Sequence, residues 1–353
     1  MAIAPERDDR PQHTGAAPTP TPRAEATDPA CPFCPGHERE TPGELWRQPA
    51  PTDATSSDWA VRVVPHRYPV LEGEQRPADH HTTGLHTVCD GVGSHEVVIE
   101  SPHHDWDLAD GDERAVADVL RAYRARHLAL RTRRPGLVLP FRNHGPAAGT
   151  SLPHPHSQIV ATPIVPLRLR QLFDVARGYY DDHGSCLYTD ETAAELADGE
   201  RMVAATEHIA ALAPYAARAP YETWIVPRCH QASFADVSDE VLAEAAALLH
   251  RLLAALRDVL GDVPYNYALI SAPNGEETTA YFAWHLQLTP RLAATAGFEL
   301  GSGIAVNPLT PEHAAARLRH ALATDHDPQP SPAPAAHPTS AAQAAATSPG
   351  GER

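Results

Sequence analysis

Apolar residues recur every three or four positions in two stretches of the chain. The first contains Val116, Leu120, Tyr123 and Leu128, and the second contains Val241, Ala245, Leu248, Leu252 and Leu256. This spacing places the apolar side chains on one face of a helix. Acidic residues precede each stretch, as is typical of a helix start. The pattern therefore predicts two amphipathic helices.

The two predicted helices belong to a diverged internal repeat. One unit, from His95, reads HEVVIESPHHDWDLADGDERAVADVLRAYRARHLAL, and the other, from Tyr221, reads YETWIVPRCHQASFADVSDEVLAEAAALLHRLLAAL. Each begins with an apolar strand and is followed by two more, LVLPFRNHG and HPHSQIVATP in the first unit and YNYALISAP and AWHLQLTPR in the second. Two such units predict an α+β fold with antiparallel sheets and helices packed outside them.

The repeat suggests a division of the chain into four parts. We expect an N-terminal arm and linker over 1–30, a first unit over 31–165 and a second, degenerate unit over 166–324. The remaining segment, 325–353, is rich in Ala, Pro and Ser and has almost no large apolar residues. It cannot bury enough surface to offset the entropy of ordering, so we expect a disordered tail.

Charge and composition limit the classes of partner that the protein can be expected to bind. The formal net charge is −17 and the chain has no lysine, which argues against general binding to nucleic acid or to anionic membranes. A phosphate site would have to be local and built from arginine, histidine and backbone N–H groups. No apolar run is long enough to cross a membrane, and the first residues do not have the pattern of a signal peptide. We expect a cytoplasmic enzyme.

The segment SLPHPHSQI carries the strongest chemical signal. In a strand His154, His156 and Gln158 would share one face. A neutral imidazole can accept a phosphoryl group, which makes His156 the candidate nucleophile. Gln158 could donate to a phosphoryl oxygen. The preceding turn, Gly149 to Ser151, could present N–H and hydroxyl groups to phosphate. The alternative is a pair of buried, hydrogen-bonded histidines.

The pair Cys31 and Cys34 has the two-residue spacing of a zinc knuckle. No second pair exists, so histidines would have to complete the site, and His104 and His154 are the best candidates. A closed Cys2His2 site would be structural. Zinc on His154 would fix the segment that presents His156. A free cysteine pair, a redox motif and ligation by His103 in place of His104 are the alternatives.

Seven segments together resemble the galactose-1-phosphate uridylyltransferase family of the histidine-triad superfamily. They are APERDDRP, CPFCPG, ESPHHD, FRNHG, GTSLPHPHSQI, YETWIVPRCH and GFELGSGIAVNPLTPEHAAARL, and the similarity covers about residues 2–320. The resemblance implies ping-pong transfer of a uridylyl group through a nucleotidyl-histidine. It also implies a homodimer whose active sites are completed by the neighbouring subunit.

By position the resemblance assigns roles to individual residues. His156 matches the nucleophile and Gln158 the glutamine that contacts the phosphoryl group. The zinc ligands match Cys31, Cys34, His104 and His154. Nucleotide and phosphate contacts match Asn143, Gly149, Thr150 and Ser151, and arginines near the substrate match Arg7 and Arg10.

Three departures from the family pattern change what it implies. The segment His66 to Pro69 replaces a family nucleotide contact. Of the histidines of a second, iron-binding site only His285 remains, and Leu172 falls about where its glutamate would be, so no iron site is expected. The hexose-contacting segment, Gly297 to Gly303, lacks the lysine and tyrosine of the uridylyltransferases. It resembles relatives that act as ADP-glucose phosphorylases.

The leading interpretation is a UDP-glucose:hexose-1-phosphate uridylyltransferase, with a nucleotide sugar and a sugar 1-phosphate as substrates and structural zinc as cofactor. The nearest alternative is a phosphorylase acting on ADP-glucose or a dinucleoside polyphosphate. A histidine-triad nucleotide hydrolase is third. A non-catalytic, zinc-stabilised nucleotide-binding protein is disfavoured by the intact His156 and Gln158.

Overall fold

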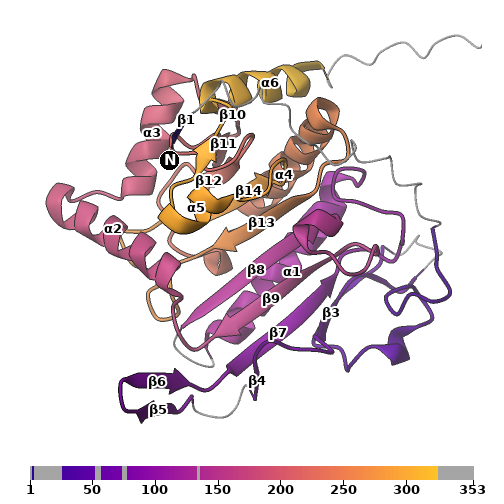
Figure 1. Cartoon of the computed structure of the whole chain (residues 1–353). Helices are drawn as coiled ribbons and strands as arrows, with labels where there is room; N and C mark the ends of the chain where they lie inside the picture. The colour runs from indigo at the N-terminus through magenta and orange to yellow at the C-terminus, as the bar shows by residue number, and fades with distance from the viewer. Residues whose placement is uncertain (1, 4–25, 52–56, 74–77, 133–135, 325–353) are drawn as a thin grey trace, which may run out of the picture.

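The computed structural model describes residues 2–3, 26–51, 57–73, 78–132 and 136–324. Most of the predicted N-terminal linker and the whole tail, 325–353, lie outside these residues. The predicted α+β class is confirmed by a mixed structure in which helices cover a largely antiparallel sheet (Figure 1).

A sheet of 11 strands runs through both repeat units. The first unit's β8 pairs with the second unit's β13 through Asn143 and Asn266, so the units share one continuous sheet rather than forming separate ones. The strand order is β10 (Met202–Ala205), β11 (Ile209–Leu212), β12 (Thr223–Pro227), β14 (His285–Pro290), β13 (Tyr265–Ile270), β8 (Leu137–His144), β9 (His156–Thr162), β7 (Val92–Ile99), β3 (Trp59–Pro65) and β2 (Trp46–Pro49), with β4 (Glu72–Gly73) parallel to β7.

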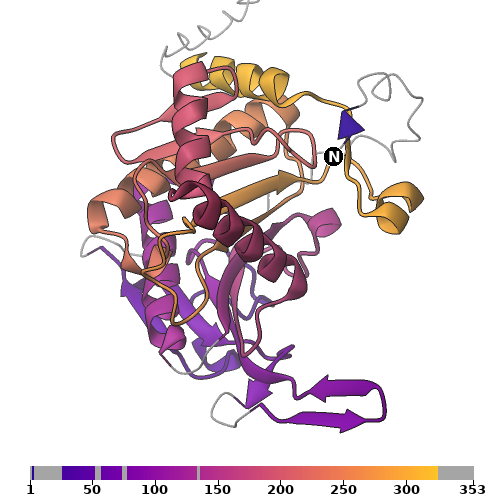
Figure 2. The ribbon, with the colours of Figure 1, turned by 90° about the vertical axis from the view of Figure 1, so that its left-hand side faces the viewer.

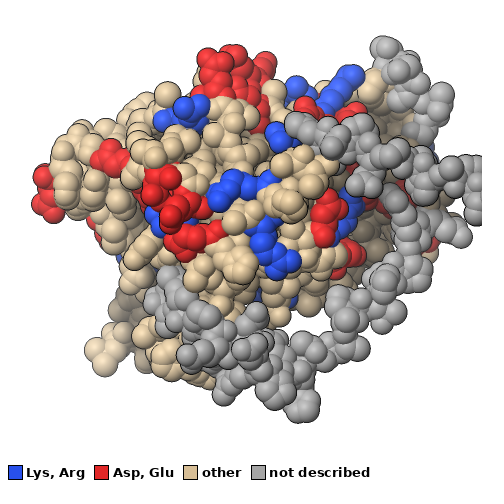
Figure 3. Space-filling model, turned by 90° about the horizontal axis from the view of Figure 1, so that it is seen from above, with Lys and Arg blue, Asp and Glu red and all other residues tan. Residues whose placement is uncertain are grey.

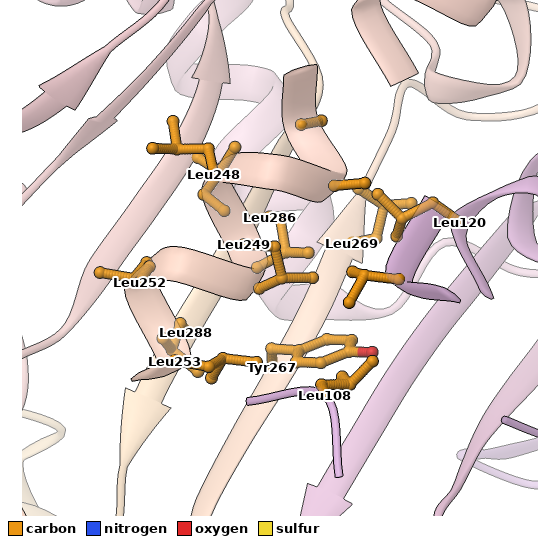
Figure 4. Packing of buried hydrophobic residues seen from close by; sticks show 14 of the residues in the cluster. Leu108, Leu120, Leu248, Leu249, Leu252, Leu253, Tyr267, Leu269, Leu286 and Leu288 are labelled. Carbon is orange, nitrogen blue, oxygen red and sulfur yellow. The ribbon is translucent and has the colours of Figure 1, made fainter. Parts of the chain in front are cut away.

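The two predicted helices, α1 (Glu113–Arg131) and α4 (Asp239–Leu260), pack together on one face of the sheet. Asp112 and Ser238 cap their first turns by accepting backbone N–H bonds. Leucines of α4 interdigitate with side chains of β13 and β14 in the main core (Figure 4). One apolar position was wrong: Leu128 is exposed and His127 is buried in its place, because the 3.6-residue period from Tyr123 reaches 127.

The opposite face of the sheet is covered over the second unit by two helices that the repeat did not predict. They are α2 (Leu167–His183) and α3 (Leu187–Asp198). Phe173 of α2 and Tyr188 of α3 pack on Ile270 and Phe282 in a second apolar cluster. Figure 2 shows these helices lying across the second half of the sheet. The face of the first unit is therefore the more open one.

Smaller elements complete the described chain. They are β1 (Ala2–Ile3) paired with β15 (Val306–Asn307), the hairpin β5 (His80–Thr83) and β6 (His86–Cys89), the helices α5 (Gly297–Ser302) and α6 (Pro311–Thr324), and the 3-10 turns η2 (Glu38–Glu40), η3 (Pro146–Ala148) and η4 (Phe234–Asp236). Within the described residues no helix has the length and apolarity to span a membrane. Figure 3 shows arginines lying among acidic side chains on one face.

Candidate active site and metal centre

His156 is the first residue of β9, on the open face of the first unit. Its Nδ1 lies 2.8 Å from the carbonyl oxygen of His154. A carbonyl only accepts, so Nδ1 carries the proton and Nε2 keeps a lone pair. Burial lowers the pKa of His156, which favours the neutral ring. The side chain is nevertheless 9% exposed. The local backbone thus leaves the lone pair of Nε2 unprotonated.

The four predicted metal ligands, Cys31, Cys34, His104 and His154, come together in one buried cluster. The Sγ of Cys34 lies 3.5 Å from Nδ1 of His104 and 3.7 Å from Nδ1 of His154. The Sγ of Cys31 lies 3.6 Å from Nδ1 of His154, and the two Nδ1 atoms are 3.3 Å apart. His103, the alternative ligand, is exposed.

These separations fit a tetrahedral ion. Zinc bonds of about 2.0–2.3 Å place two nitrogen ligands roughly 3.3 Å apart and a nitrogen roughly 3.6 Å from a sulfur. All four ligand atoms lie within 4.8 Å of one another, and no fifth protein ligand joins them in the described chain. The donor set, two thiols and two imidazoles, suits zinc. The cluster can therefore hold a metal ion with closed coordination.

The segment between the metal cluster and His156 is an irregular bend. The prediction that His154 lies within the strand was wrong, because β9 begins at His156. Pro153 and Pro155 flank His154 and have no N–H to donate to a neighbouring strand. His154 is held instead through its Nε2, which donates to the carbonyl of Ser101 at 2.8 Å. Phe33, between the two cysteines, packs edge-on against both His154 and His156.

Gln158 lies two residues beyond His156 on the same face of β9. Its Oε1 is 2.7 Å from Nε2 of His95 on β7. The sequence analysis did not find His95. The signal was present, because His95 is a polar residue inside the fully buried strand β7. It stacks on His66, the residue that replaces the family's usual nucleotide contact, with ring centroids 4.1 Å apart.

The predicted phosphate-binding turn follows β8. Gly149 has φ +98°, a backbone conformation that favours glycine. The hydroxyl of Thr150 donates to the carbonyl of Asn143, which folds the turn back on the strand. The side-chain oxygen of Asn143 accepts from Asn266 of the second unit at 2.8 Å. Ser151 and Gly149 are exposed. Arg7 and Arg10 lie outside the described residues.

A hollow of about 580 Å³ opens on the sheet face that carries His156 and Gln158, toward the second unit. Phe141 and Asn143 of β8 line it, and Phe141 pairs with Gln158 across the sheet. Three arginines, Arg168, Arg218 and Arg291, line it together with the carboxylates of Glu222 and Glu299. The guanidinium groups can contact an anionic ligand.

His285, the second unit's counterpart of His156, is enclosed by aromatic rings. It stacks on Tyr188 and Trp224 with centroids 5.1 and 4.7 Å away. Burial lowers its pKa to about 4. Leu172 packs on the apolar cluster of α2 and α3. Apolar packing therefore occupies the surroundings of His285.

Comparison with known proteins identifies the family of the chain. The sequence model of the galactose-1-phosphate uridyl transferase N-terminal domain matches residues 1–166, and that of the C-terminal domain matches residues 173–330. The chain belongs to the galactose-1-phosphate uridylyltransferase family. The family resemblance stated from the sequence is thus confirmed, and with it the class of nucleotidyltransferase enzymes.

Two curated relatives carry different activities in their names. ADP-glucose phosphorylase of Arabidopsis thaliana is 33% identical over 304 residues, covering 84% of this chain and 83% of the relative. Galactose-1-phosphate uridylyltransferase of Thermotoga maritima is 31% identical over 265 residues, covering 72% and 82%. The crystal structure of the Arabidopsis phosphorylase with bound ADP-glucose superposes with a TM-score of 0.74 at 30% identity over 90% of this chain and 93% of that one.

Proposed function

We propose that the protein transfers a nucleoside monophosphate from a nucleotide sugar to a phosphorylated acceptor through a covalent intermediate on His156. The observation that carries this proposal is the hydrogen bond of Nδ1 to the His154 carbonyl. It leaves the lone pair of Nε2 available on an accessible face of the sheet. Family membership supplies the class of reaction.

In the first step the lone pair of Nε2 attacks the α-phosphorus of the donor. The new P–N bond forms as the bond from phosphorus to the bridging oxygen breaks, and the leaving sugar 1-phosphate takes that electron pair. The Nδ1 proton stays on the ring, where the His154 carbonyl stabilises the developing positive charge. Gln158 donates its amide N–H to a nonbridging oxygen.

In the second step an acceptor phosphate oxygen attacks the same phosphorus. The P–N bond breaks and its electron pair returns to Nε2, which restores the free enzyme. At the exposed end of the turn after β8, Ser151 offers a backbone N–H and a hydroxyl to the phosphates, while the N–H groups of Gly149 and Thr150 bond within the turn. The hollow beside Asn143 provides room for the substrates, and its three arginines can contact their phosphates.

We infer that the metal cluster holds structural zinc. Bound at Cys31, Cys34, His104 and His154, the ion would supply a rigid cross-link and, with four protein ligands, no position for substrate. His154 is both a ligand and the residue whose carbonyl orients His156. A metal ion that fixes His154 would therefore also fix the position of the His156 ring. Thiolate ligands also fit a reducing compartment such as the cytoplasm.

The leading donor and acceptor are UDP-glucose and a hexose 1-phosphate, the substrates implied by the uridylyltransferase relatives. A second candidate is phosphorolysis of ADP-glucose. It is favoured by the match to the Arabidopsis phosphorylase and by the segment Gly297 to Gly303, which lacks the lysine and tyrosine of the uridylyltransferases. Transfer of the nucleoside monophosphate to water would make the protein a hydrolase. We further propose a homodimer, which light scattering can test.

Intact-mass measurement tests the intermediate directly. The protein is mixed with UDP-glucose or ADP-glucose without acceptor, and the adduct mass identifies the transferred nucleotide. Adding galactose 1-phosphate, inorganic phosphate or buffer then identifies the acceptor that removes the adduct. An acid-labile adduct absent from a His156→Ala protein is expected. Turnover without any adduct in single-turnover sampling would rule out the covalent mechanism.

A further inference from the structure

The two ends of the Gln158 amide do opposite things beside a phosphoryl group. The NH2 end donates to an anionic oxygen, while the carbonyl end repels it. Gln158 and His156 lie two residues apart on one strand face, a separation of roughly 7 Å between backbone positions. Which end of the amide faces the reacting phosphorus therefore decides whether Gln158 assists transfer or opposes it.

The orientation of the Gln158 amide is determined through His95 by a backbone N–H group. The N–H of Val70 points at Nδ1 of His95 at 3.2 Å. A backbone N–H can only donate, so Nδ1 must be the unprotonated nitrogen and Nε2 must carry the proton. Burial lowers the pKa of His95 and keeps the ring neutral. Nε2–H then donates to Oε1 of Gln158 at 2.7 Å, and the NH2 end is turned away from His95.

The ring of His95 is itself held in place by a second imidazole. His66 stacks on it with an angle of 13° between the ring planes. The ring of His66 is fixed in the same manner, because its Nδ1 accepts from the backbone N–H of Tyr68 at 2.9 Å. Two backbone N–H groups thus set the orientation of both rings before any substrate binds.

The second unit provides an internal comparison at the same position. Val97 pairs with Gln158, and Trp224 pairs with Gln287. Two residues earlier stand His95 in the first unit and Glu222 in the second. The Glu222 carboxylate can only accept, and it takes the NH2 of Gln287 at 2.7 Å. The residue at this position therefore sets the direction of the amide in each unit, and the direction is opposite in the two.

We propose that His95 is a positioning residue for nucleotidyl transfer, which holds the Gln158 carbonyl so that the amide NH2 faces the transferring phosphoryl group. This inference rests on the proposed function, since it assigns the donor that stabilises the phosphoryl oxygen. His95 itself acts only through Gln158.

A double-mutant cycle tests that dependence. Gln158→Ala should lower kcat by roughly 10²–10³ without lowering the melting temperature. His95→Phe keeps the ring stack and should lower kcat about 10-fold or more, because the amide can then flip. His95→Glu copies the second unit and should approach the loss of Gln158→Ala. His95→Gln, whose NH2 can still donate, should recover part of the rate.

In the Gln158→Ala protein the added His95→Phe change should alter kcat less than about 2-fold, since non-additivity marks residues that act as a unit. Full additivity, or unchanged kcat in His95→Glu, would overturn the proposal. His81→Phe is the matched control, because this histidine lies in the β5–β6 hairpin with 65% of its side chain exposed.

A second measurement does not need activity. Nitrogen-15 NMR of the histidine rings should show His95 as the neutral Nε2–H form at pH 7, and the Nε2 shift should change in Gln158→Ala. An Nδ1–H or doubly protonated ring would overturn the inference. If no donor supports turnover, the proposed function fails while this spectrum still decides how His95 holds Gln158.

Discussion

The two halves of the chain carry the same strand motif in different surroundings. His156 and His285 each direct Nδ1 at the carbonyl of the residue two positions earlier, at 2.8 and 3.4 Å. The backbone thus favours the same tautomer in both halves. Their exposure differs, at 9% for His156 and 1% for His285. If His156 is the nucleophile, the same ring orientation in His285 shows that orientation alone is not sufficient, because the surroundings also decide whether substrate can reach the ring.

Three differences distinguish the surroundings of His285 from those of His156. Helices α2 and α3 cover its face of the sheet, and Tyr188 and Trp224 enclose His285. Gln287 has its amide NH2 engaged by Glu222, and that carboxylate would repel a phosphate. At the position of His154, the second half has Ala283, buried among aromatic side chains. Apolar packing there replaces the metal cluster of the first half.

The largest predicted difference between the halves is in catalysis. His156→Ala should lower kcat by about 10⁴-fold or more, the order expected for a lost nucleophile. His285→Phe should keep kcat within about 2-fold and leave the melting temperature unchanged or higher. Among the described residues, Nε2 of His285 is buried without a hydrogen-bond partner, so replacing the ring by phenyl removes an unsatisfied polar atom. Steady-state kinetics and calorimetry on both variants make the comparison.

Equal losses of activity in the two variants would show that the second half still takes part in the chemistry. Imidazole added to a His156→Gly protein provides a further control. Recovery of transfer would locate the defect at the missing ring rather than in the fold.

The second predicted difference concerns how each half is held together. Cys31→Ser should lower zinc content from about one ion per chain and reduce the melting temperature by roughly 5 °C or more, because metal binding contributes to folding stability. His103→Ala is the matched control and should change neither, since His103 is exposed beside the buried ligand His104. Elemental analysis and thermal unfolding measure both effects.

Activity should fall in Cys31→Ser only as order around His154 is lost. Full stability combined with abolished turnover would instead mark the metal as catalytic. A requirement for His103 rather than His104 would move the ligand assignment by one residue.

Local patterns in the sequence predicted the elements that repeat, and failed where a contact is specific to one half. The periodicity around Leu120 and Leu248 predicted α1 and α4. Helix α2 has no counterpart in the first unit, so the repeat gave no reason to expect it. His95 and Gln158 lie 63 residues apart. Their contact depends on the pairing of β7 with β9, and the residues of either strand taken alone do not show which strand it pairs with.

The smallest predicted effect is a pH dependence of stability at the β8–β13 pairing, where the two halves meet. His144, at the end of β8, stacks on Tyr265 of β13 with centroids 4.7 Å apart. Its nitrogens face the carboxylates of Asp107 and Asp262 at 3.2 and 2.9 Å, while Arg142 lies nearby. Burial and Arg142 lower the pKa of His144, but the two carboxylates outweigh them and raise it. The folded protein therefore binds this proton more tightly than the unfolded chain does.

A raised pKa stabilises the protein at low pH. The contribution of His144 is complete below the ordinary histidine value and disappears as pH rises through the raised folded value. The melting temperature should therefore fall by about 2 °C between pH 6 and pH 8.5, a small change because Asp262 is largely exposed. Asp262→Asn should flatten this slope, and differential scanning calorimetry at matched ionic strength measures it. A slope unchanged in Asp262→Asn would show that protonation of His144 beside Asp262 does not contribute to stability, and would place the pH dependence elsewhere in the protein.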